Sequence, residues 1–153
     1  MPTPEETLKE LGLELPPVVK PVAAYVPAVR TGNLVYVSGQ VPMRDGKLVA
    51  TGKLGGEVSP DTGIECARQC ALNALAALNS VAPLGEVRRI VKVLAFIAST
   101  PDFTGQPQIA NGASELFGQV LGEAGQHARS AIGVPVLPLD APVEVEIQVE
   151  LVP

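Results

Sequence analysis

The feature that most constrains the fold lies near the end of the chain, where residues 143–151 read VEVEIQVEL. Every second residue is a branched aliphatic one, and the residues between them are three glutamates and one glutamine. Because side chains alternate between the two faces of a strand, this segment predicts a strand with one apolar face and one acidic face. The apolar face must be covered, so we expect a sheet with helices packed on one side.

A helical pattern supplies the expected cover. Ser59 is a good capping residue, and it is followed by apolar residues spaced along one face of a helix, Ile64, Ala67, Ala71, Leu75 and Leu78. This spacing predicts a helix over residues 59–81. A second helix is predicted in residues 111–125, which end in glycine.

Further segments rich in branched and aromatic residues predict the rest of the sheet. A TGN turn at 31–33 separates an extended stretch from a strand at 34–42 and indicates a hairpin. The remaining strands are expected at 87–99, 128–137 and 142–152. The glycine-rich residues 44–58 lack the spacing of a phosphate-binding loop, so we expect a flexible connection with at most a short strand. This order predicts an α+β fold, with two helices on one face of a mixed or antiparallel sheet.

Apolar residues are also expected on the face of the sheet that the helices leave uncovered. Both alternating sets of residues 87–98 become apolar toward their C-terminal half, and the set that contains Val93 also holds Arg89 and Val91. Residues 34–37 are apolar on both sides as well. We therefore expect another copy of the chain to pack on this face, which would place the acids of the last strand near a cleft between subunits. The alternative is a solvated sheet face on which those acids limit aggregation.

Charge and composition argue against several classes of partner. The net charge of −5 comes without a cluster of lysine or arginine, so a nucleic acid is not expected as the main partner. No apolar stretch approaches a membrane span and the first residues are charged, so we expect no membrane partner and a cytoplasmic location. Cys66 and Cys70 are expected to be thiols of the core, and a single histidine gives no metal-ligand cluster.

Several stretches, in their order and spacing, resemble the RidA/YjgF/UK114 family: AYVPAV, GNLVYVSGQVP, CALNALAAL, PDF, HARSAIGVPVLP and PVEVEIQVEL. The resemblance implies a chorismate-mutase-like fold and a homotrimer, in which the sheets form a central barrel, the helices lie outside and the sites lie between subunits. We accordingly divide the chain into an N-terminal extension, residues 1–20, and one RidA-like domain, residues 21–153. Thr3 and Glu6 have the spacing of a capping box and predict a short helix in the extension, ending before Gly12.

The resemblance also implies an activity, the hydrolysis of reactive enamines and imines, such as 2-aminoacrylate, to 2-oxo acids and ammonia. Arg129 matches the arginine that binds the substrate carboxylate, and Glu144 matches a glutamate that would orient or activate the attacking water. Neither a metal nor an organic cofactor is expected. For Arg129 the alternative is a charge at a strand end, paired with an acid.

Other positions follow from the same match, and each has a structural alternative. Tyr25 is expected to line the pocket from a neighbouring subunit, or else to be a core residue with its hydroxyl at the rim. Asn111 is expected to lie near the site, or else to cap a helix. Ser38 and Gly39 are expected to form the floor through backbone contacts, or else mark a strand end with a tight bend. His127 fits a general base or, alternatively, a structural or surface residue.

The chain departs from the family pattern at three other positions. Ala131 stands where active deaminases of the family commonly have cysteine, Ala24 precedes Tyr25 in place of proline, and Leu139 stands where many members have lysine. These changes bear on which substrate the site accepts more than on whether it binds a carboxylate. Two hypotheses therefore stay open, a deaminase and a non-catalytic trimer that binds or senses a small carboxylate or carbonyl metabolite. The endoribonuclease label also used for this family is not favoured by the acidic charge.

Overall fold

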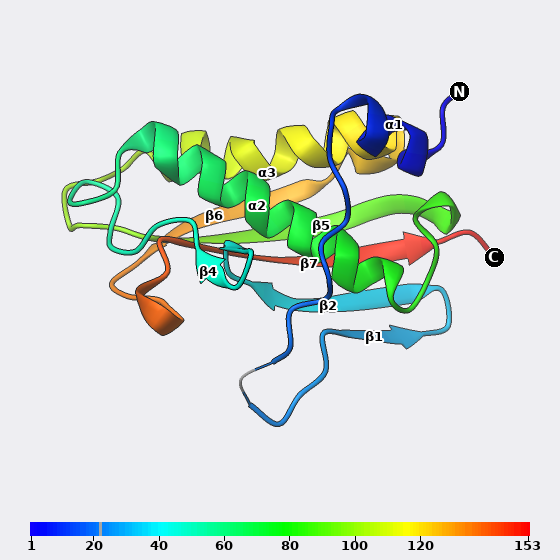
Figure 1. Cartoon of the computed structure of the whole chain (residues 1–153), viewed down its shortest axis with the longest axis horizontal. Coiled ribbons are helices and arrows are strands. Elements are labelled where there is room, and N and C mark those ends of the chain that lie inside the picture. The colour runs from blue at the N-terminus through cyan, green and yellow to red at the C-terminus, as the bar shows by residue number, and fades with distance from the viewer. Residues whose placement is uncertain (22) are drawn as a thin grey trace.

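A single larger sheet runs through the computed structural model, which describes residues 1–21 and 23–153. In these residues five strands follow the order β1-β2-β7-β5-β6, and β3 and β4 form a separate hairpin (Figure 1). The strands are β1 Ala28–Thr31, β2 Leu34–Gln40, β3 Met43–Arg44, β4 Lys47–Leu48, β5 Val87–Ala98, β6 Ala128–Val134 and β7 Val143–Leu151. β6 is parallel to β5 and the other pairs of the larger sheet are antiparallel, which confirms the predicted mixed α+β arrangement.

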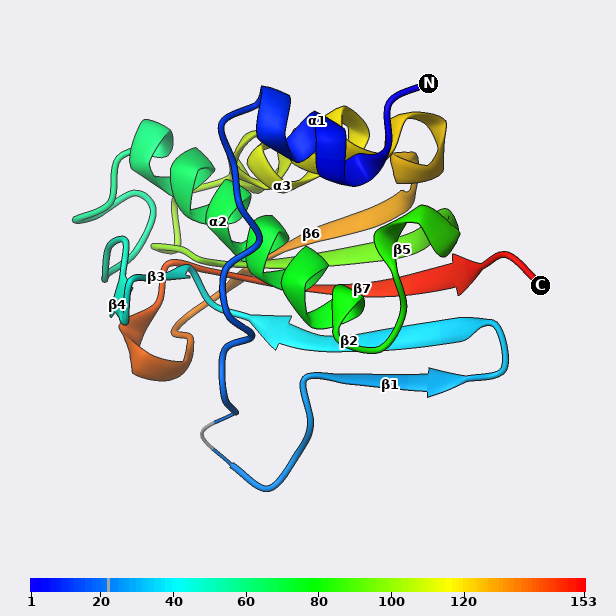
Figure 2. The ribbon, with the colours of Figure 1, turned by 45° about the vertical axis from the view of Figure 1, so that its right-hand side comes forward.

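Helices α2 (Pro60–Asn79) and α3 (Gln106–Leu121) lie side by side over one face of this sheet, and α1 (Pro4–Glu10) packs against α3 (Figure 2). Short 3-10 helices follow at Leu84–Glu86 (η1), Gly122–Gly125 (η2) and Pro138–Asp140 (η3). The two long helices approach closely at Gly112, where a Cβ would collide with the backbone oxygen of Ile64. Thr3 caps α1 in the predicted capping box with Glu6.

The alternation of β7 is confirmed by its burial. Its apolar residues lie under the helices, each at most 1% exposed: Val143, Val145, Ile147, Val149 and Leu151. β2 alternates in the same way, since Val35 and Val37 are buried while Leu34 and Tyr36 are exposed. One face of the sheet is therefore buried in the core. On the other face, apolar side chains are exposed to solvent in a single chain.

The expected alternation of β5 is wrong in its first half. Irregularities in the pairing with β7 occur between Val87 and Arg89 and again between Ile90 and Lys92. Each shift changes which residues face the core, because an extra residue in one strand reverses the alternation that follows it. Ile90 is consequently buried together with Val93, whereas Arg89 and Val91, which the sequence pattern groups with Val93, are exposed.

Several boundaries differ from the sequence expectation, two of them for clear physical reasons. Helix α3 begins at Gln106, five residues before the predicted start at 111, because Pro107 fits the first turn and the capping position is Gly105, which offers no side-chain signal. Strand β6 ends at Val134 instead of residue 137, where Pro135 removes the backbone donor that a further ladder bond needs.

The glycine-rich connection 44–58 is more ordered than predicted. Asp45 and Gly46, with φ angles of 52° and 80°, form the turn between β3 and β4. Leu54 is fully buried, its N–H donates to the Ala98 carbonyl, and its own carbonyl accepts from Thr100 N–H. A hairpin and a buried anchor therefore replace the expected flexible loop.

The segment that follows α1 crosses the outer side of α2 (Figure 1). Leu13, Leu15 and Val18 pack against the hydrophobic core, and Leu8 of α1 is only 4% exposed. With this cover, the outward side of α2 is also buried, as at Leu72. The N-terminal residues therefore share the core of the rest of the chain.

Candidate functional site

Arg129 is partly buried on the edge strand β6, and α3 holds its guanidinium through neutral acceptors. Nη1 donates to Oδ1 of Asn111 at 2.8 Å and to Oγ of Ser114 at 3.2 Å, and Nη2 donates to the Pro107 carbonyl at 3.3 Å. None of the ion pairs formed among the described residues includes Arg129. The alternative of a strand-end charge paired with an acid therefore does not apply within the chain.

The guanidinium keeps free donors for a ligand. Of its five N–H groups, the chain's described residues accept from three, which leaves Nε–H and one N–H on Nη2. A carboxylate is well suited to such a cation, because its two oxygens accept charge-assisted hydrogen bonds. The arrangement can therefore bind an anionic group without first breaking an internal ion pair.

Sequence reasoning identified Asn111 but missed Pro107 and Ser114. These three residues are spaced i, i+4 and i+7, and so lie along one face of α3. The signal was present in the sequence, but the predicted helix began at 111, which left Pro107 outside it. Asn111 is consequently not a cap; it lies inside the helix and binds Arg129.

Glu144 lies in a separate hollow of about 140 Å³. The walls are mostly apolar, and they come from the N-terminal segment, the end of β2 and η3: Val19, Lys20, Pro21, Tyr25, Pro27, Gly39, Gln40, Val41, Met43, Pro138 and Leu139. The Glu144 carboxylate lies directly over Gly39, where any Cβ would collide with Oε1. Burial, and secondarily the nearby Glu146, raises the pKa of Glu144 above its ordinary value.

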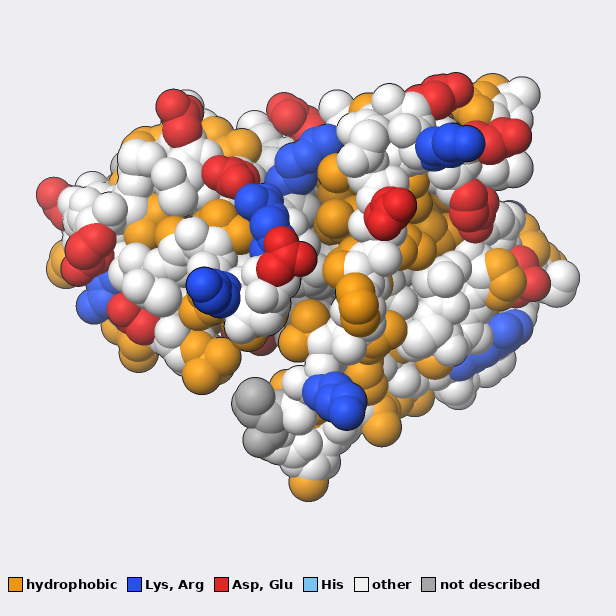
Figure 3. All heavy atoms as spheres, viewed as in Figure 1, with side chains coloured by type: hydrophobic (Ala, Val, Ile, Leu, Met, Phe, Trp, Pro, Cys, Tyr) orange, Lys and Arg blue, Asp and Glu red, His pale blue; other side chains and the backbone are white. Residues whose placement is uncertain are grey.

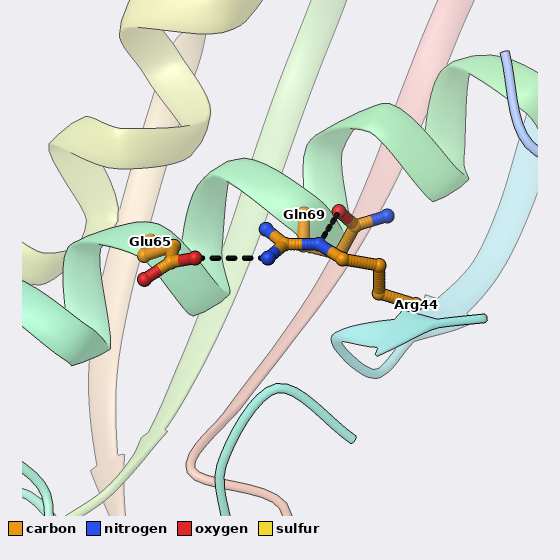
Figure 4. A network of polar contacts seen from close by, with 3 residues as sticks. All are labelled: Arg44, Glu65 and Gln69. Carbon is orange, nitrogen blue, oxygen red and sulfur yellow. Dashed lines mark hydrogen bonds and ion pairs between the residues drawn. The ribbon is translucent and has the colours of Figure 1, made fainter. Parts of the chain in front are cut away.

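Side-chain amides hold the wall of this hollow next to α2. Asn73 Nδ2 donates to the carbonyls of Val41 at 3.1 Å and Met43 at 3.0 Å, and Gln69 donates to Asn73 at 3.0 Å. Arg44 Nε in turn donates to Gln69, and its Nη1 pairs with Glu65 at 2.9 Å (Figure 4). The turn after β2 is therefore fixed by a satisfied polar network.

The remaining predicted residues divide between the hollow and its surroundings. Tyr25, 50% exposed, lines the hollow with Gly39 and Glu144. Ser38 does not line it; its hydroxyl donates to the Val26 carbonyl at 2.7 Å and ties β2 to the residues before β1. Ala131 packs against the core, so the position two places after the arginine offers only a methyl group.

The two charged residues lie on opposite faces of the sheet within one chain. Arg129 pairs with Val93, and Val93 pairs with Ile147, which is buried under the helices. Glu144 pairs with Phe96 and is three residues from Ile147 on β7. Because side chains alternate along a strand, the Glu144 side chain points to the face opposite the helices. The chain thus joins Arg129 to Asn111, and Glu144 to Tyr25 and Gly39, but it does not join the two groups.

Comparison with known proteins places the chain in a family. The family described as endoribonuclease L-PSP matches residues 7–151. The chain belongs to this family, and the resemblance to RidA/YjgF proteins is confirmed. The solved structure of a protein of unknown function from Agrobacterium tumefaciens is 44% identical, with a TM-score of 0.91, over 97% of this chain and 92% of that one.

Curated relatives match most of the chain. Protein TCP17 of Trypanosoma cruzi is 42% identical over 94% of this chain and 91% of its own length. A protein of Dermatophagoides farinae named 2-iminobutanoate/2-iminopropanoate deaminase is 32% identical over 88% of this chain and 91% of its own length. The chain therefore corresponds to nearly the whole of each relative.

The described residues offer few other candidates for a nucleophile or a metal site. Cys66 and Cys70 are fully buried, and burial raises the pKa of the Cys66 thiol to about 11 and that of the Cys70 thiol well above its ordinary value. Thiols held protonated in this way are poor nucleophiles, as expected for core residues. Residues 1–21 and 23–153 contain no group of acidic, histidine and cysteine side chains placed to hold a metal ion. In the same residues no helix has the length and apolar character needed to cross a membrane.

Proposed function

We propose that the protein is a cofactor-independent hydrolytic deaminase of carboxylate-bearing enamines and imines, such as 2-aminoacrylate. The observation that carries the proposal is Arg129, a partly buried cation held by neutral acceptors with two N–H groups left free. The similarity to a relative named as a 2-iminobutanoate/2-iminopropanoate deaminase supports the same class of reaction.

In the proposed reaction Arg129 binds the substrate carboxylate and so fixes the adjacent imine carbon. An enamine first gains a proton from solvent at carbon and becomes the iminium ion. Water then adds to the iminium carbon while Glu144 accepts a proton from it, which gives a neutral carbinolamine. Glu144 returns this proton to the nitrogen, the C–N bond breaks, and the departing ammonia takes the remaining hydroxyl proton, so that the products are a 2-oxo acid and ammonium. The raised pKa of Glu144 supports this role, because it makes the carboxylate a stronger base near neutral pH.

A site that contains both groups requires two copies of the chain, because they lie on opposite faces of the sheet in one copy. Arg129 lies on the edge strand β6, from which it can reach a neighbouring molecule. The uncovered face also exposes apolar side chains suited to an interface, Val29, Leu34, Tyr36 and Ile132. We therefore propose the homotrimer implied by the resemblance, with the Arg129 of one copy facing the Glu144 hollow of the next.

A second candidate is a non-catalytic trimer that binds a small carboxylate in the same place. Ala131 and the apolar wall at Leu139 favour it, since active deaminases of the family commonly have cysteine at the first position and many members have lysine at the second. Binding needs Arg129 alone, whereas hydrolysis also needs Glu144. RNA cleavage is not favoured, because the net charge is −5 and the basic residues on the face in Figure 3 lie dispersed.

The deciding experiment generates 2-aminoacrylate in place with a serine dehydratase and traps it with semicarbazide. The rate of 2-oxo acid release is compared for the wild type, Arg129→Ala, the control Arg68→Ala and a blank. Arg68 is a suitable control because its guanidinium binds Gln119 on the helix surface, away from both halves of the site. We expect the wild type and Arg68→Ala to accelerate release and Arg129→Ala to fall to the blank. A folded, oligomeric wild type no faster than the blank would contradict hydrolysis of this substrate.

A further inference from the structure

A continuous run of hydrogen bonds connects Arg129 to the backbone of η2. Nη1 of Arg129 donates to Ser114 Oγ, this oxygen lies 2.8 Å from Nε2 of His127, and Nδ1 of His127 lies 2.6 Å from the Gly125 carbonyl oxygen. The Phe117 ring packs against the imidazole edge to face, with ring centres 6.0 Å apart. The histidine is therefore fixed on both nitrogens and on one side of its ring.

The groups at the ends set the direction of every bond in this run. A carbonyl oxygen only accepts, so the Gly125 carbonyl requires the proton of His127 to be on Nδ1. In the neutral ring Nε2 is then an acceptor, and the hydroxyl hydrogen of Ser114 is donated to it. A lone pair of the Ser114 oxygen is consequently turned toward Arg129.

We infer that His127 and Ser114 are positioning residues for Arg129. They orient an acceptor toward one Nη1–H, while Asn111 accepts from the same nitrogen and Pro107 from Nη2, so the guanidinium is held against α3 with Nε–H and one Nη2–H free. The inference rests on the proposed function, in which those free groups bind the substrate carboxylate. His127 itself contacts neither Arg129 nor the reacting atoms in this arrangement, so it acts only through Ser114.

The arrangement has a consequence in acid. A protonated His127 would donate from Nε2 as well, and the Ser114 oxygen would have to accept from two cations at once. The other charged groups around the imidazole are Arg88 and Arg89 at the start of β5 and Glu123 of η2, which border a hollow with it. Protonation of His127 would therefore weaken the acceptor that holds Arg129, and carboxylate binding with it.

The hydrogen-bond direction can be measured without assignment, because the chain has a single histidine. Selective ¹⁵N labelling of histidine and a long-range ¹H–¹⁵N correlation report which ring nitrogen carries the proton. We expect the Nδ1–H form in the wild type and in the control Gln126→Ala, whose side chain is exposed and outside the run. Addition of pyruvate, a 2-oxo acid product, should shift the ring signals of the wild type but not those of Ser114→Ala. The Nε2–H form in the wild type would overturn the inference.

Pyruvate affinity, measured by calorimetry, tests the positioning role apart from turnover. Loss of one hydrogen bond to a charged group predicts about 10-fold weaker binding in Ser114→Ala, near-wild-type binding in Ser114→Thr and Gln126→Ala, and a flatter pH profile in His127→Asn. In turnover the Ser114→Ala change should raise KM with little change in kcat. Gln126→Ala should keep the pH profile of pyruvate affinity, since the Gln126 side chain is exposed and not in the run.

The outcomes separate this inference from the proposed function. A wild type that binds pyruvate with the expected Ser114 dependence but does not release 2-oxo acid from 2-aminoacrylate would support the inference and contradict the deaminase. Unchanged affinity in folded Ser114→Ala and His127→Asn would overturn the inference even if the wild type is an active deaminase. A wild type that does not bind pyruvate at all would count against both.

Discussion

The Arg129 region and the Glu144 hollow place opposite charges in the same sheet by different physical means. Around Arg129, three acceptors on α3 are hydrogen-bonded to the guanidinium, and the charge is stabilised by neutral dipoles. Around Glu144 the walls are mainly apolar, Gly39 provides room, and burial makes the charged form less favourable. The first region keeps a cation oriented and charged, and the second keeps an acid ready to take up a proton.

The difference indicates how the two regions divide the work of the proposed site. A group that binds a carboxylate should hold its charge and its orientation before the ligand arrives, because ordering it during binding would reduce affinity. A general base should instead have a proton affinity close to that of the group it serves, and burial provides this. Because they lie on opposite faces of the sheet, the division in the proposed trimer is also one between neighbouring copies of the chain.

Mixed oligomers test this division most directly. Arg129→Ala and Glu144→Ala should each be inactive, but a 1:1 mixture that is unfolded and reassembled should recover about a quarter of the wild-type rate. In a cyclic oligomer with random assembly, each site takes its arginine from one copy and its glutamate from the next, and both are intact in about one site of four. No recovery, with mixed oligomers verified by mass spectrometry, would mean that both groups act from the same copy.

Displacing Glu144 while leaving Arg129 untouched should separate the two regions within one variant. In Gly39→Ala the new Cβ occupies the place of Oε1 of Glu144, so we expect kcat to fall about 100-fold, as for the loss of a general base, with pyruvate affinity nearly unchanged. Gly118→Ala is the matched control, because a Cβ there meets open space and its backbone angle suits other residues. Comparable losses in affinity and kcat would show that the two regions are not independent.

Much of the fold was predictable because local patterns and burial agree. Strict alternation identified both faces of β7, and the capping residue and apolar spacing identified α2. The errors occur where the local signal is weak: the irregularities of β5 come from its pairing with β7, and the start of α3 lacks a side-chain cap. Such features depend on partners far away in the sequence.

The candidate site was predictable only in part for the same reason. Resemblance identified Arg129, Asn111, Gly39 and Glu144, but no sequence pattern shows that the first two lie on one face of the sheet and the last two in a hollow elsewhere. That separation depends on the register between β5, β6 and β7. Residues 19–21 also line the hollow. The sequence did not predict this, because these residues belong to a segment without periodicity.

A change of Arg129 that keeps the charge should sharpen the contrast between an oriented cation and a simple one. Lysine cannot contact Asn111 and Pro107 and also present two parallel donors, so we expect Arg129→Lys to raise KM by about 10- to 100-fold. The exposed pairing of Arg68 with Gln119 should tolerate Arg68→Lys without a change in KM. A normal KM in Arg129→Lys would mean that charge alone, without the orientation provided by α3, binds the substrate.

The smallest effect concerns the stability of the Glu144 hollow. Its raised pKa means that the folded state holds this proton to higher pH than the unfolded state, so the wild type loses stability as pH rises from the ordinary glutamate range through the folded pKa. Glu144→Gln removes this loss, and its free energy of unfolding at pH 7 should exceed that of the wild type by less than about 1 kcal/mol, because the carboxyl is partly exposed.

Urea unfolding of both proteins from pH 4 to 8 measures this difference, which should shrink toward pH 4. Glu150→Gln is the control, since Glu150 pairs with Arg88 and Arg89 and its removal should not stabilise the protein. Glu144→Gln that is less stable than the wild type at pH 7 would mean that the charged carboxylate is favoured in the assembled protein. The neighbouring copy's Arg129, which the proposed trimer places opposite the hollow, would then lie close enough to outweigh the effect of burial, and the contrast with the Arg129 region would hold only for the isolated chain.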